Sequence, residues 1–427
     1  MKILQISDIH WSKTSRMLDE YKDLRDGMMN YLELYCQQKK EKFDWIFICG
    51  DIAFSGDEEQ YKKAQAFIKN LCEIIGCRES EVLMVPGNHD KNREAGPKLL
   101  RNELDRLMGD EKIKADVLLG DALQNNITSC KFLFEPFYEY DKFSSSFNLR
   151  ETLMAKLLDD KKMQPYDEAV DKMYWDRTLK ENLNGFNIYA YGVNTAFTCD
   201  ANDFDFSKKG KDGHKMFLSK IAYNDSRCRP NSINILLAHH PVAFLVNGEN
   251  IGKKLDKLYQ IQFFGHVHRT DSNVENGAIH IFSGALQPPA GEANDEDYKP
   301  VFNIVDIDVI NSGKKKELQV KLDVIAWNGE DFYKDLKKSN TLSLKIKTRI
   351  LNEEPMNESV NTSVDIDKSN LRWRFFKMHS VEKIVEEIKP GLYSQDSVDY
   401  VNRLNFWKYI SQNGLWQNLS DKMKSYE

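Results

Sequence analysis

Two histidines stand one residue apart in the stretch FFGHVHRTD, directly after an apolar run. On an extended backbone, His266 and His268 point to the same side of the strand and can meet one polar object, or two objects close together. An HxH pair by itself is also typical of an ordinary surface strand end. Its interpretation therefore depends on which other side chains the fold brings to the same place.

Similar side chains follow apolar runs elsewhere in the chain. Six of the nine histidines belong to the short segments SDIH, GDIAFSG, PGNHD, LLAHHP and GHVH. Together these segments supply carboxylates, imidazoles and an amide: Asp8, His10, Asp51, Asn88, His89, His239, His240, His266 and His268. This mixture suits a borderline divalent metal such as Mn, Fe, Zn or Ni, and it does not suit Ca. One aspartate can also bridge two metals about 3.5–4 Å apart, which is the spacing that two-metal phosphoesterases use.

Short apolar strands must position these side chains. Strands are expected at residues 2–7, 43–50 and 81–87, and a helix capped by Asp57 is expected at about 58–75. This alternation of strand and helix indicates βαβ units and an α/β sheet. In such sheets function collects at the carboxyl ends of the strands, where the first three polar segments stand.

The rest of the chain predicts two further regions. Additional strands are expected at 186–195, 233–241, 260–268, 277–284, 301–310 and 318–327. Charged helical patterns at about 93–185 predict a helical insertion, so we expect a catalytic domain over residues 1–335. Polar residues 336–370 are expected to form a linker or an extended segment. Amphipathic patterns predict a small helical domain over 371–427.

The motifs DxH, GDxxxxG, GNHD, a histidine after an apolar strand, and GHxH follow one another in this order. In this they resemble the calcineurin-like metallophosphoesterase family, over about residues 1–92 and 186–330. The resemblance implies an α/β fold, a β-sandwich flanked by helices in four αββα layers. It also implies hydrolysis of phosphoesters with two divalent metal ions, for which Mn comes first and Fe, Zn or Ni are alternatives.

The resemblance further implies a role for the polar side chains of the motifs. Seven residues would hold the two metals: Asp8, His10 and His268 one ion, Asn88, His239 and His266 the other, with Asp51 as the bridge. His89 would act as general acid to the leaving oxygen or as an imidazolium that stabilises the phosphate. Asp90 would orient His89, or it is a simple turn residue. His240 would contact substrate, or it makes a structural hydrogen bond.

The motifs also narrow the branch of the family. GDIAFSG and PGNHD differ from the GDYVDRG and RGNHE of protein Ser/Thr phosphatases, and Phe54 stands where purple acid phosphatases have a tyrosine. The remaining branches resemble DNA-repair-type exonucleases and cyclic-nucleotide-type phosphodiesterases. We therefore expect a nuclease acting on DNA or RNA first, a small-molecule phosphoesterase such as a cyclic-nucleotide phosphodiesterase second, and a non-catalytic binding or scaffold subunit third.

A basic segment bears on that choice. Residues 314–349 contain ten Lys or Arg against five Asp or Glu, and KKSNTLSLKIKTR (337–349) places cations at alternate positions. A nuclease would use such a stripe to contact phosphate backbones. The alternative is a solvated hairpin edge whose lysines prevent aggregation. The net charge of −6 and pI of about 5.9 weigh against a chain built as a whole to bind polyanions.

Composition sets further expectations about compartment and partners. The seven cysteines are odd in number and contain no CxxC pair, which suits a reducing cytoplasm and argues against a disulfide framework. No apolar run of about 18 residues and no signal peptide are seen, so no membrane association is expected.

The aromatic residues after 371 are expected to form a small core or a docking face for a protein partner. By analogy, such an appended domain suits a multi-component bacterial defence or repair system, and a homo-oligomer is left open.

Overall fold

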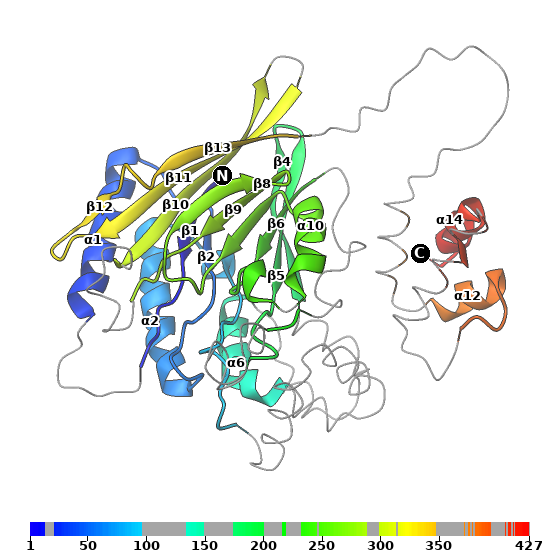
Figure 1. Cartoon of the computed structure of the whole chain (residues 1–427), viewed down its shortest axis with the longest axis horizontal. Helices are drawn as coiled ribbons and strands as arrows, with labels where there is room; N and C mark the ends of the chain where they lie inside the picture. Colours follow the sequence, from blue (N-terminus) through cyan, green and yellow to red (C-terminus); the bar gives the residue numbers. More distant parts are fainter. Residues whose placement is uncertain are drawn as a thin grey trace.

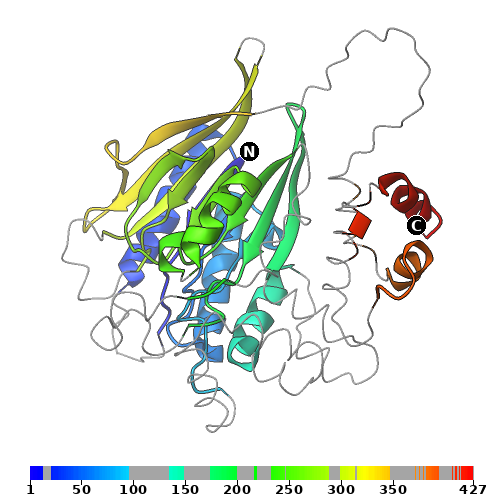
Figure 2. The ribbon, with the colours of Figure 1, turned by 45° about the vertical axis from the view of Figure 1, so that its right-hand side comes forward.

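Two β-sheets lie face to face in the computed structural model, and helices cover their outer faces (Figure 1). The residues that the structure describes are 1–12, 21–95, 134–148, 174–199, 216–218, 232–245, 247–287, 299–312, 315–346, 381–393, 415–426 and single positions between 371 and 413. The expected αββα sandwich is confirmed. Figure 2 shows the same layers turned by 45°, with helix α10 in front of the second sheet.

The first sheet has the strand order β12-β11-β10-β1-β2-β3, and β13 also pairs with β11. Its strands are β1 (Lys2–Ile6), β2 (Trp45–Ile48), β3 (Val82–Met84), β10 (Val301–Ser312), β11 (Lys315–Trp327), β12 (Phe332–Lys334) and β13 (Asn340–Lys345). Strands β1, β2 and β3 run parallel, whereas β10 is antiparallel to β1. The carboxyl ends of the three parallel strands therefore meet at one edge.

The second sheet has the strand order β4-β5-β6-β7-β9-β8. Its strands are β4 (Tyr174–Leu183), β5 (Phe186–Val193), β6 (Ile233–Leu237), β7 (Ile261–Phe264), β8 (Asp271–Glu275) and β9 (Ala278–Phe282). The four inner strands are parallel, and the two outer strands are antiparallel to their neighbours. Apolar side chains of both sheets meet in the middle of the sandwich, where the rings of Phe47 and Phe263 lie 5.3 Å apart, edge to face.

Helices pack on the outside because their apolar sides need cover. Helices α1 (Lys22–Lys39), α2 (Glu58–Ile75) and α6 (Tyr138–Asn148) cover the first sheet, and α10 (Gly248–Leu258) covers the second (Figure 1). Asp57 caps α2 as expected, because its side chain accepts a hydrogen bond from the backbone N–H of Glu59 at 3.1 Å. None of the described helices is long and apolar enough to cross a membrane.

Two of the strands that were not expected from the sequence adjoin Asn-Gly turns. Residues 174–183, the end of the predicted helical insertion, form β4, and residues 271–275 form β8. Both strands enter a hairpin through an Asn-Gly pair, Asn184-Gly185 and Asn276-Gly277, in which both residues have positive φ. Asn-Gly between two extended runs is a strong hairpin signal, but charged side chains hide the alternation in both strands. Of the predicted insertion, 96–133 and 149–173 lie outside the described residues.

The first sheet also extends beyond the predicted domain boundary at residue 335. Strand β13 pairs with β11 from Asn340↔Leu322 to Lys345↔Glu317, so it is part of the sheet. Residues 347–370 of the predicted linker lie outside the described residues. Within the C-terminal region, α12 (Glu382–Ile388) and α14 (Trp416–Lys424) contribute to an apolar cluster of their own, in which the rings of Phe375 and Phe406 lie 5.4 Å apart.

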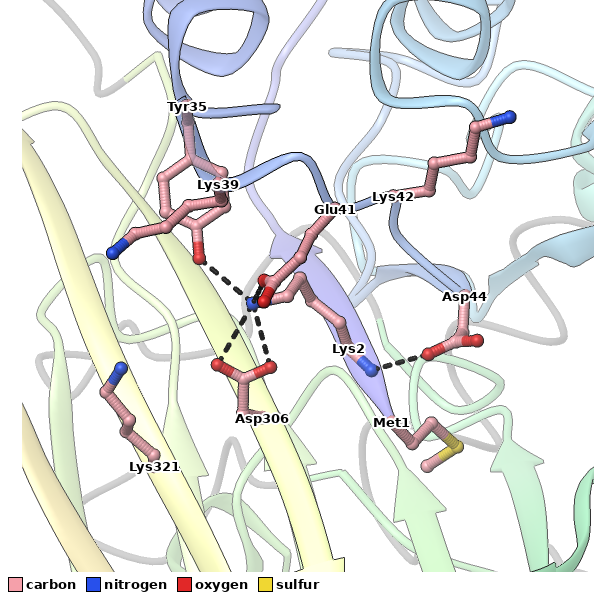
Figure 3. Close-up of a pocket in the computed structure, with 9 residues that line it drawn as sticks. All are labelled: Met1, Lys2, Tyr35, Lys39, Glu41, Lys42, Asp44, Asp306 and Lys321. Atoms are coloured by element: carbon pink, nitrogen blue, oxygen red, sulfur yellow. Dashed lines mark hydrogen bonds and ion pairs between the residues drawn. The ribbon is translucent and has the colours of Figure 1, made fainter. Parts of the chain in front are cut away.

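A group of charged residues ties the amino end of β1 to its neighbours (Figure 3). The ammonium group of Lys2 lies 3.0 Å from the hydroxyl of Tyr35 on α1, 2.9 Å from Asp306 on β10 and 3.0 Å from Glu41. Burial lowers the pKa of Lys2, but the hydrogen bonds to these three groups outweigh it and raise that pKa above its ordinary value. These residues line a hollow of about 460 Å³, which lies at the opposite end of β1 from Asp8.

Candidate metal centre

The predicted metal ligands occupy loops with an unusual backbone. Five of them have left-handed φ values: Asp8 (53°), His10 (52°), Asp51 (52°), His266 (68°) and His268 (52°). This conformation is costly for residues other than glycine and persists only where the surroundings impose it. Here the loops after β1 and β2 exchange backbone hydrogen bonds, because the N–H of residue 8 donates to the carbonyl of residue 50, and those of residues 9 and 10 donate to the carbonyl of residue 51.

Two glycines allow the loops to approach one another closely. A Cβ atom on Gly265 would lie 2.2 Å from Oγ of Ser7 and 2.5 Å from the carbonyl oxygen of Cys49. A Cβ atom on Gly87 would lie 2.0 Å from Oδ1 of Asp51. The glycines of the GHxH and GNHD motifs are therefore needed because side chains there would displace the carboxylates and their neighbours.

The structure brings together the three ligands predicted for the first metal. Nε2 of His268 lies 3.2 Å from Oδ1 of Asp8 and 3.4 Å from Nε2 of His10. Asp8 is fully buried, and its Oδ2 accepts hydrogen bonds from Ser7 and from the backbone N–H of His266. Its Oδ1 accepts no hydrogen bond from the residues that the structure describes. A buried carboxylate oxygen that faces two imidazoles fits a cation.

The second predicted set gathers around His239. Its Nε2 lies 3.3 Å from Oδ2 of Asp51 and 3.3 Å from Oδ1 of Asn88. The His239 and His266 rings lie 5.1 Å apart. Nδ1 of His239 donates a hydrogen bond to the carbonyl oxygen of Cys49 at 2.7 Å, because a carbonyl can only accept. This bond orients the ring and turns Nε2 toward the carboxylate, as expected for a metal-binding histidine.

One carboxylate joins the two sets. Ligand atoms of Asp8, Asp51 and His239 all lie within 4.8 Å of one another, and so do those of His10, Asp51 and His89. Asp51 belongs to both of these groups, and at 1% exposed it lies in the interior. The donor set, two buried carboxylates with imidazoles and an amide oxygen, fits two borderline divalent metals that share Asp51.

Burial and neighbouring charges shift the pKa values of the predicted ligands. Burial lowers the pKa of His10 to about 4 and that of His266 to about 3, so both rings are neutral at pH 7. Burial raises the pKa of Asp51, but the charge of His239 outweighs it and holds that pKa well below its ordinary value. Burial likewise disfavours charge on His239, yet Asp51 raises its pKa to about 9. In the metal-free protein, protonated His239 therefore neutralises the charge of Asp51, as a bound cation would.

The carboxylate of Asp90 makes its hydrogen bonds to groups other than His89 among the described residues. It accepts hydrogen bonds from the backbone N–H groups of Ala53 at 2.9 Å and Gly87 at 2.9 Å, and from the hydroxyl of Tyr61 at 3.0 Å. Burial, together with the charge of Asp51, raises the pKa of Asp90 to about 6. Asp90 therefore positions the loops that carry the metal ligands.

His240 has no exposed surface, so it cannot act as an open substrate-contacting residue without a rearrangement. Its Nδ1 lies 2.9 Å from Oγ1 of Thr195, and its Nε2 lies 3.1 Å from Oδ1 of Asn88. The structure therefore places His240 behind the amide ligand, in the hydrogen-bonding arrangement that was the alternative. Thr195 and Tyr61 were missed by the sequence analysis, because neither belongs to a motif that could have revealed it.

His89 lies beside the ligands in a distinct arrangement. Its backbone N–H donates to Oδ1 of Asp51 at 2.8 Å, and its Nδ1 lies 2.8 Å from the carbonyl oxygen of Phe54. Because that carbonyl can only accept, Nδ1 carries a proton and Nε2 is the nitrogen left for chemistry. The ring meets the His10 ring edge to face at 4.8 Å. His89 thus lies beside the first ligand set, and its Nδ1 is hydrogen-bonded to the carbonyl of Phe54.

Residues 1–270 match the model of one family, described as calcineurin-like phosphoesterase. The chain belongs to the calcineurin-like phosphoesterase family. The order of the five motifs predicted this family.

The similar proteins share little sequence identity with this chain. The "uncharacterized metallophosphoesterase-like protein YydB" of Bacillus subtilis (strain 168) is 23% identical over 368 residues, which cover 82% of this chain and 64% of that protein. This chain therefore spans less than two thirds of the relative's length. Similar solved structures include GAP50 of Plasmodium, with 10% identity, a TM-score of 0.39 and coverage of 82% of this chain and 89% of that one. The purple acid phosphatase PPD1 of yellow lupin has 13% identity, a TM-score of 0.39 and coverage of 81% and 53%.

Proposed function

We propose that this chain hydrolyses nucleotide phosphodiesters, and that its substrate is a short stretch or end of DNA or RNA. The observation that carries the proposal is the position of His89 beside two ligand sets that share Asp51. Its backbone N–H and its Nδ1 are hydrogen-bonded, and within the described residues Nε2 has no hydrogen-bond partner. Two bound divalent cations would neutralise the phosphate and make water a nucleophile near neutral pH.

The chain's own residues supply the remaining steps. The ligand loops hold the carboxylates and imidazoles in place before substrate arrives, because Asp90 and the backbone hydrogen bonds between the loops fix them. Protonated His89 donates a proton from Nε2 to the leaving sugar oxygen, while Phe54 retains the proton on Nδ1. A sugar alkoxide is a poor leaving group, so such a donor contributes typically 10²- to 10⁴-fold in rate.

The end of the basic segment that carries Lys316 lies far from the metal centre. Lys316 pairs with Asn311, which is five residues beyond Asp306, and Asp306 pairs with Lys2, six residues before Asp8. Eleven residues at about 3.3 Å each give a separation of about 36 Å along the sheet. The ammonium group of Lys316 is also engaged already, by the carbonyl of Asn184 at 2.5 Å. This position favours the solvated hairpin edge over a stripe for phosphate backbones.

The substrate is therefore proposed to have a small footprint. A strand end or short oligonucleotide needs few phosphate contacts outside the metal centre, and a cyclic nucleotide, the second candidate, needs none. The distance of Lys316 from the ligands is the specific observation that keeps this second candidate.

The test is hydrolysis by the full chain loaded with Mn²⁺, with Asp51→Asn as the inactive control. The substrates are bis-p-nitrophenyl phosphate, p-nitrophenyl phosphate, cyclic AMP, dinucleotides and long single- and double-stranded DNA and RNA. The proposal expects diesters to be preferred over the monoester and the activity on dinucleotides to change little with salt, since only about one or two phosphates are contacted. Exclusive cleavage of long duplexes with a steep salt dependence would refute it.

A further inference from the structure

An exposed aromatic ring stands at the metal centre. The exposed aromatic side chains of the described residues are Phe54, Tyr333 and Tyr426, and Phe54 is the one whose ring contacts the site histidines. Its ring lies 5.1 Å from that of His89 and 6.3 Å from that of His10. Single exposed apolar side chains are common, but the Phe54 ring, 50% exposed, lies against the histidines of the centre, where it can gain by covering an aromatic group of a ligand.

The backbone prevents this ring from retreating into the core. The N–H of Phe54 donates to the carbonyl of Trp11 at 2.9 Å, and the carbonyl of Phe54 accepts from Nδ1 of His89 at 2.8 Å. The preceding residue, Ala53, is held by Asp90. The chain on both sides of Phe54 is thus fixed by the same contacts that fix the metal ligands and the proton donor.

We propose that the Phe54 ring stacks against the nucleobase on the leaving group of the substrate. This inference rests on the proposed function, in which His89 protonates the leaving oxygen. Since His89 and Phe54 are adjacent, the leaving nucleoside must lie on the side of the centre where the ring is exposed. Every nucleobase has an aromatic face, so a phenylalanine platform binds the leaving nucleoside without choosing its sequence. Phe54 is thereby a specificity-determining residue for nucleosides over simple alkyl groups.

The test uses three dinucleotides with the Mn²⁺-loaded full chain: thymidylyl-thymidine and its two analogues with an abasic sugar on one side or the other. The fragment that retains the phosphate identifies the leaving side. Phe54→Ala should lower kcat/KM for the dinucleotides with a base on the leaving side by about fivefold or more, which is the lower limit for loss of one stacked base. The analogue that is abasic on the leaving side should change less than about twofold. Phe54→Trp should restore the preference.

Tyr333→Ala serves as the matched control, because it removes an exposed aromatic ring from β12. Equal losses on all three dinucleotides in Phe54→Ala, or none, would overturn the stacking role while leaving the phosphodiesterase intact. A loss that follows the base on the retained side would overturn it as well. If the wild type cleaves neither the dinucleotides nor bis-p-nitrophenyl phosphate, the proposed function fails, and the stacking role fails with it.

Discussion

Oδ2 of Asp51 lies 3.3 Å from Nε2 of His239, and the two residues follow strands of different sheets. Asp51 follows β2 in the first sheet, and His239 follows β6 in the second. The metal centre is therefore built across the sandwich, and each sheet supplies part of the ligand set. Its integrity depends on how the two sheets pack.

Asp51→Asn should remove the bridge between the ligand sets. A neutral amide cannot neutralise two cations, so bound metal should fall from two ions to one or none, and hydrolysis should fall by about 100-fold or more. Metal analysis of the purified protein and the rate on bis-p-nitrophenyl phosphate measure both effects. Asp331→Asn, an exposed aspartate next to β12, is the control. Two tightly bound ions in Asp51→Asn would contradict the bridging role.

His89→Asn should keep both metals and slow turnover by about 10²- to 10⁴-fold. The loss should be largest for substrates with alkoxide leaving groups and smallest for p-nitrophenyl esters, whose leaving group needs no proton. Rates across a series of leaving groups, with metal content measured in parallel, test this. Loss of metal in the variant would instead make His89 a ligand, which its distance to His10 and Asp51 also permits.

Asp90→Ala should act on the structure of the centre. The variant leaves backbone N–H groups of Ile52, Ala53 and Gly87 without their acceptor, which costs about 1–3 kcal/mol each when they stay dry. We expect metal affinity to fall by about 10- to 100-fold and unfolding in urea to begin at lower concentration. At saturating metal, the dependence of rate on the leaving group should match that of the wild type. If the rate of Asp90→Ala depends more weakly or more strongly on the leaving group than that of the wild type, Asp90 has a catalytic role.

Metal affinity should increase with pH. The pKa of His239 is raised to about 9 in the metal-free protein, so this histidine carries a proton at neutral pH and must lose it to bind a cation. His10 and His266, with pKa values of about 4 and 3, are already neutral and release nothing. The apparent Kd for Mn²⁺ should therefore fall by about tenfold per unit between pH 6 and 8. Calorimetry in buffers of different ionisation enthalpy measures the proton release, and His280→Gln is the control histidine variant.

Lys2→Met should weaken the fold and leave the chemistry unchanged. The variant removes the cation shared by Glu41 and Asp306, two carboxylates at the far end of β1 from the metal centre. We expect a loss of about 1–2 kcal/mol in the free energy of unfolding, since Lys2 is largely covered but its partners are partly exposed. Urea denaturation measures the loss, and Lys39→Met, on the same hollow, is the matched control. Reduced metal binding in Lys2→Met would contradict the separation of the two ends.

The sequence by itself predicted which residues gather at the candidate metal centre. Asp8, Asp51, Asn88 and His266 each follow an apolar run, and parallel strands must place such residues at one edge. The motif order also predicted the family and the αββα sandwich. Among the strands that escaped prediction are β4 and β8, whose charged residues hide the alternation and which only the Asn-Gly turns mark.

Only the tertiary structure decided what the neighbours of the ligands do. Sequence adjacency suggested that Asp90 serves His89, yet Asp90 points to the loop after β2 and His89 is held by Phe54. Likewise, alternating cations suggested a stripe at the site, whereas strand register places Lys345, the one that the structure describes, at the far end of the sheet. Spacing along the chain constrains which residues share a strand end. The direction in which a side chain points at a strand end depends on packing between segments distant in sequence, so adjacency along the chain does not reveal it.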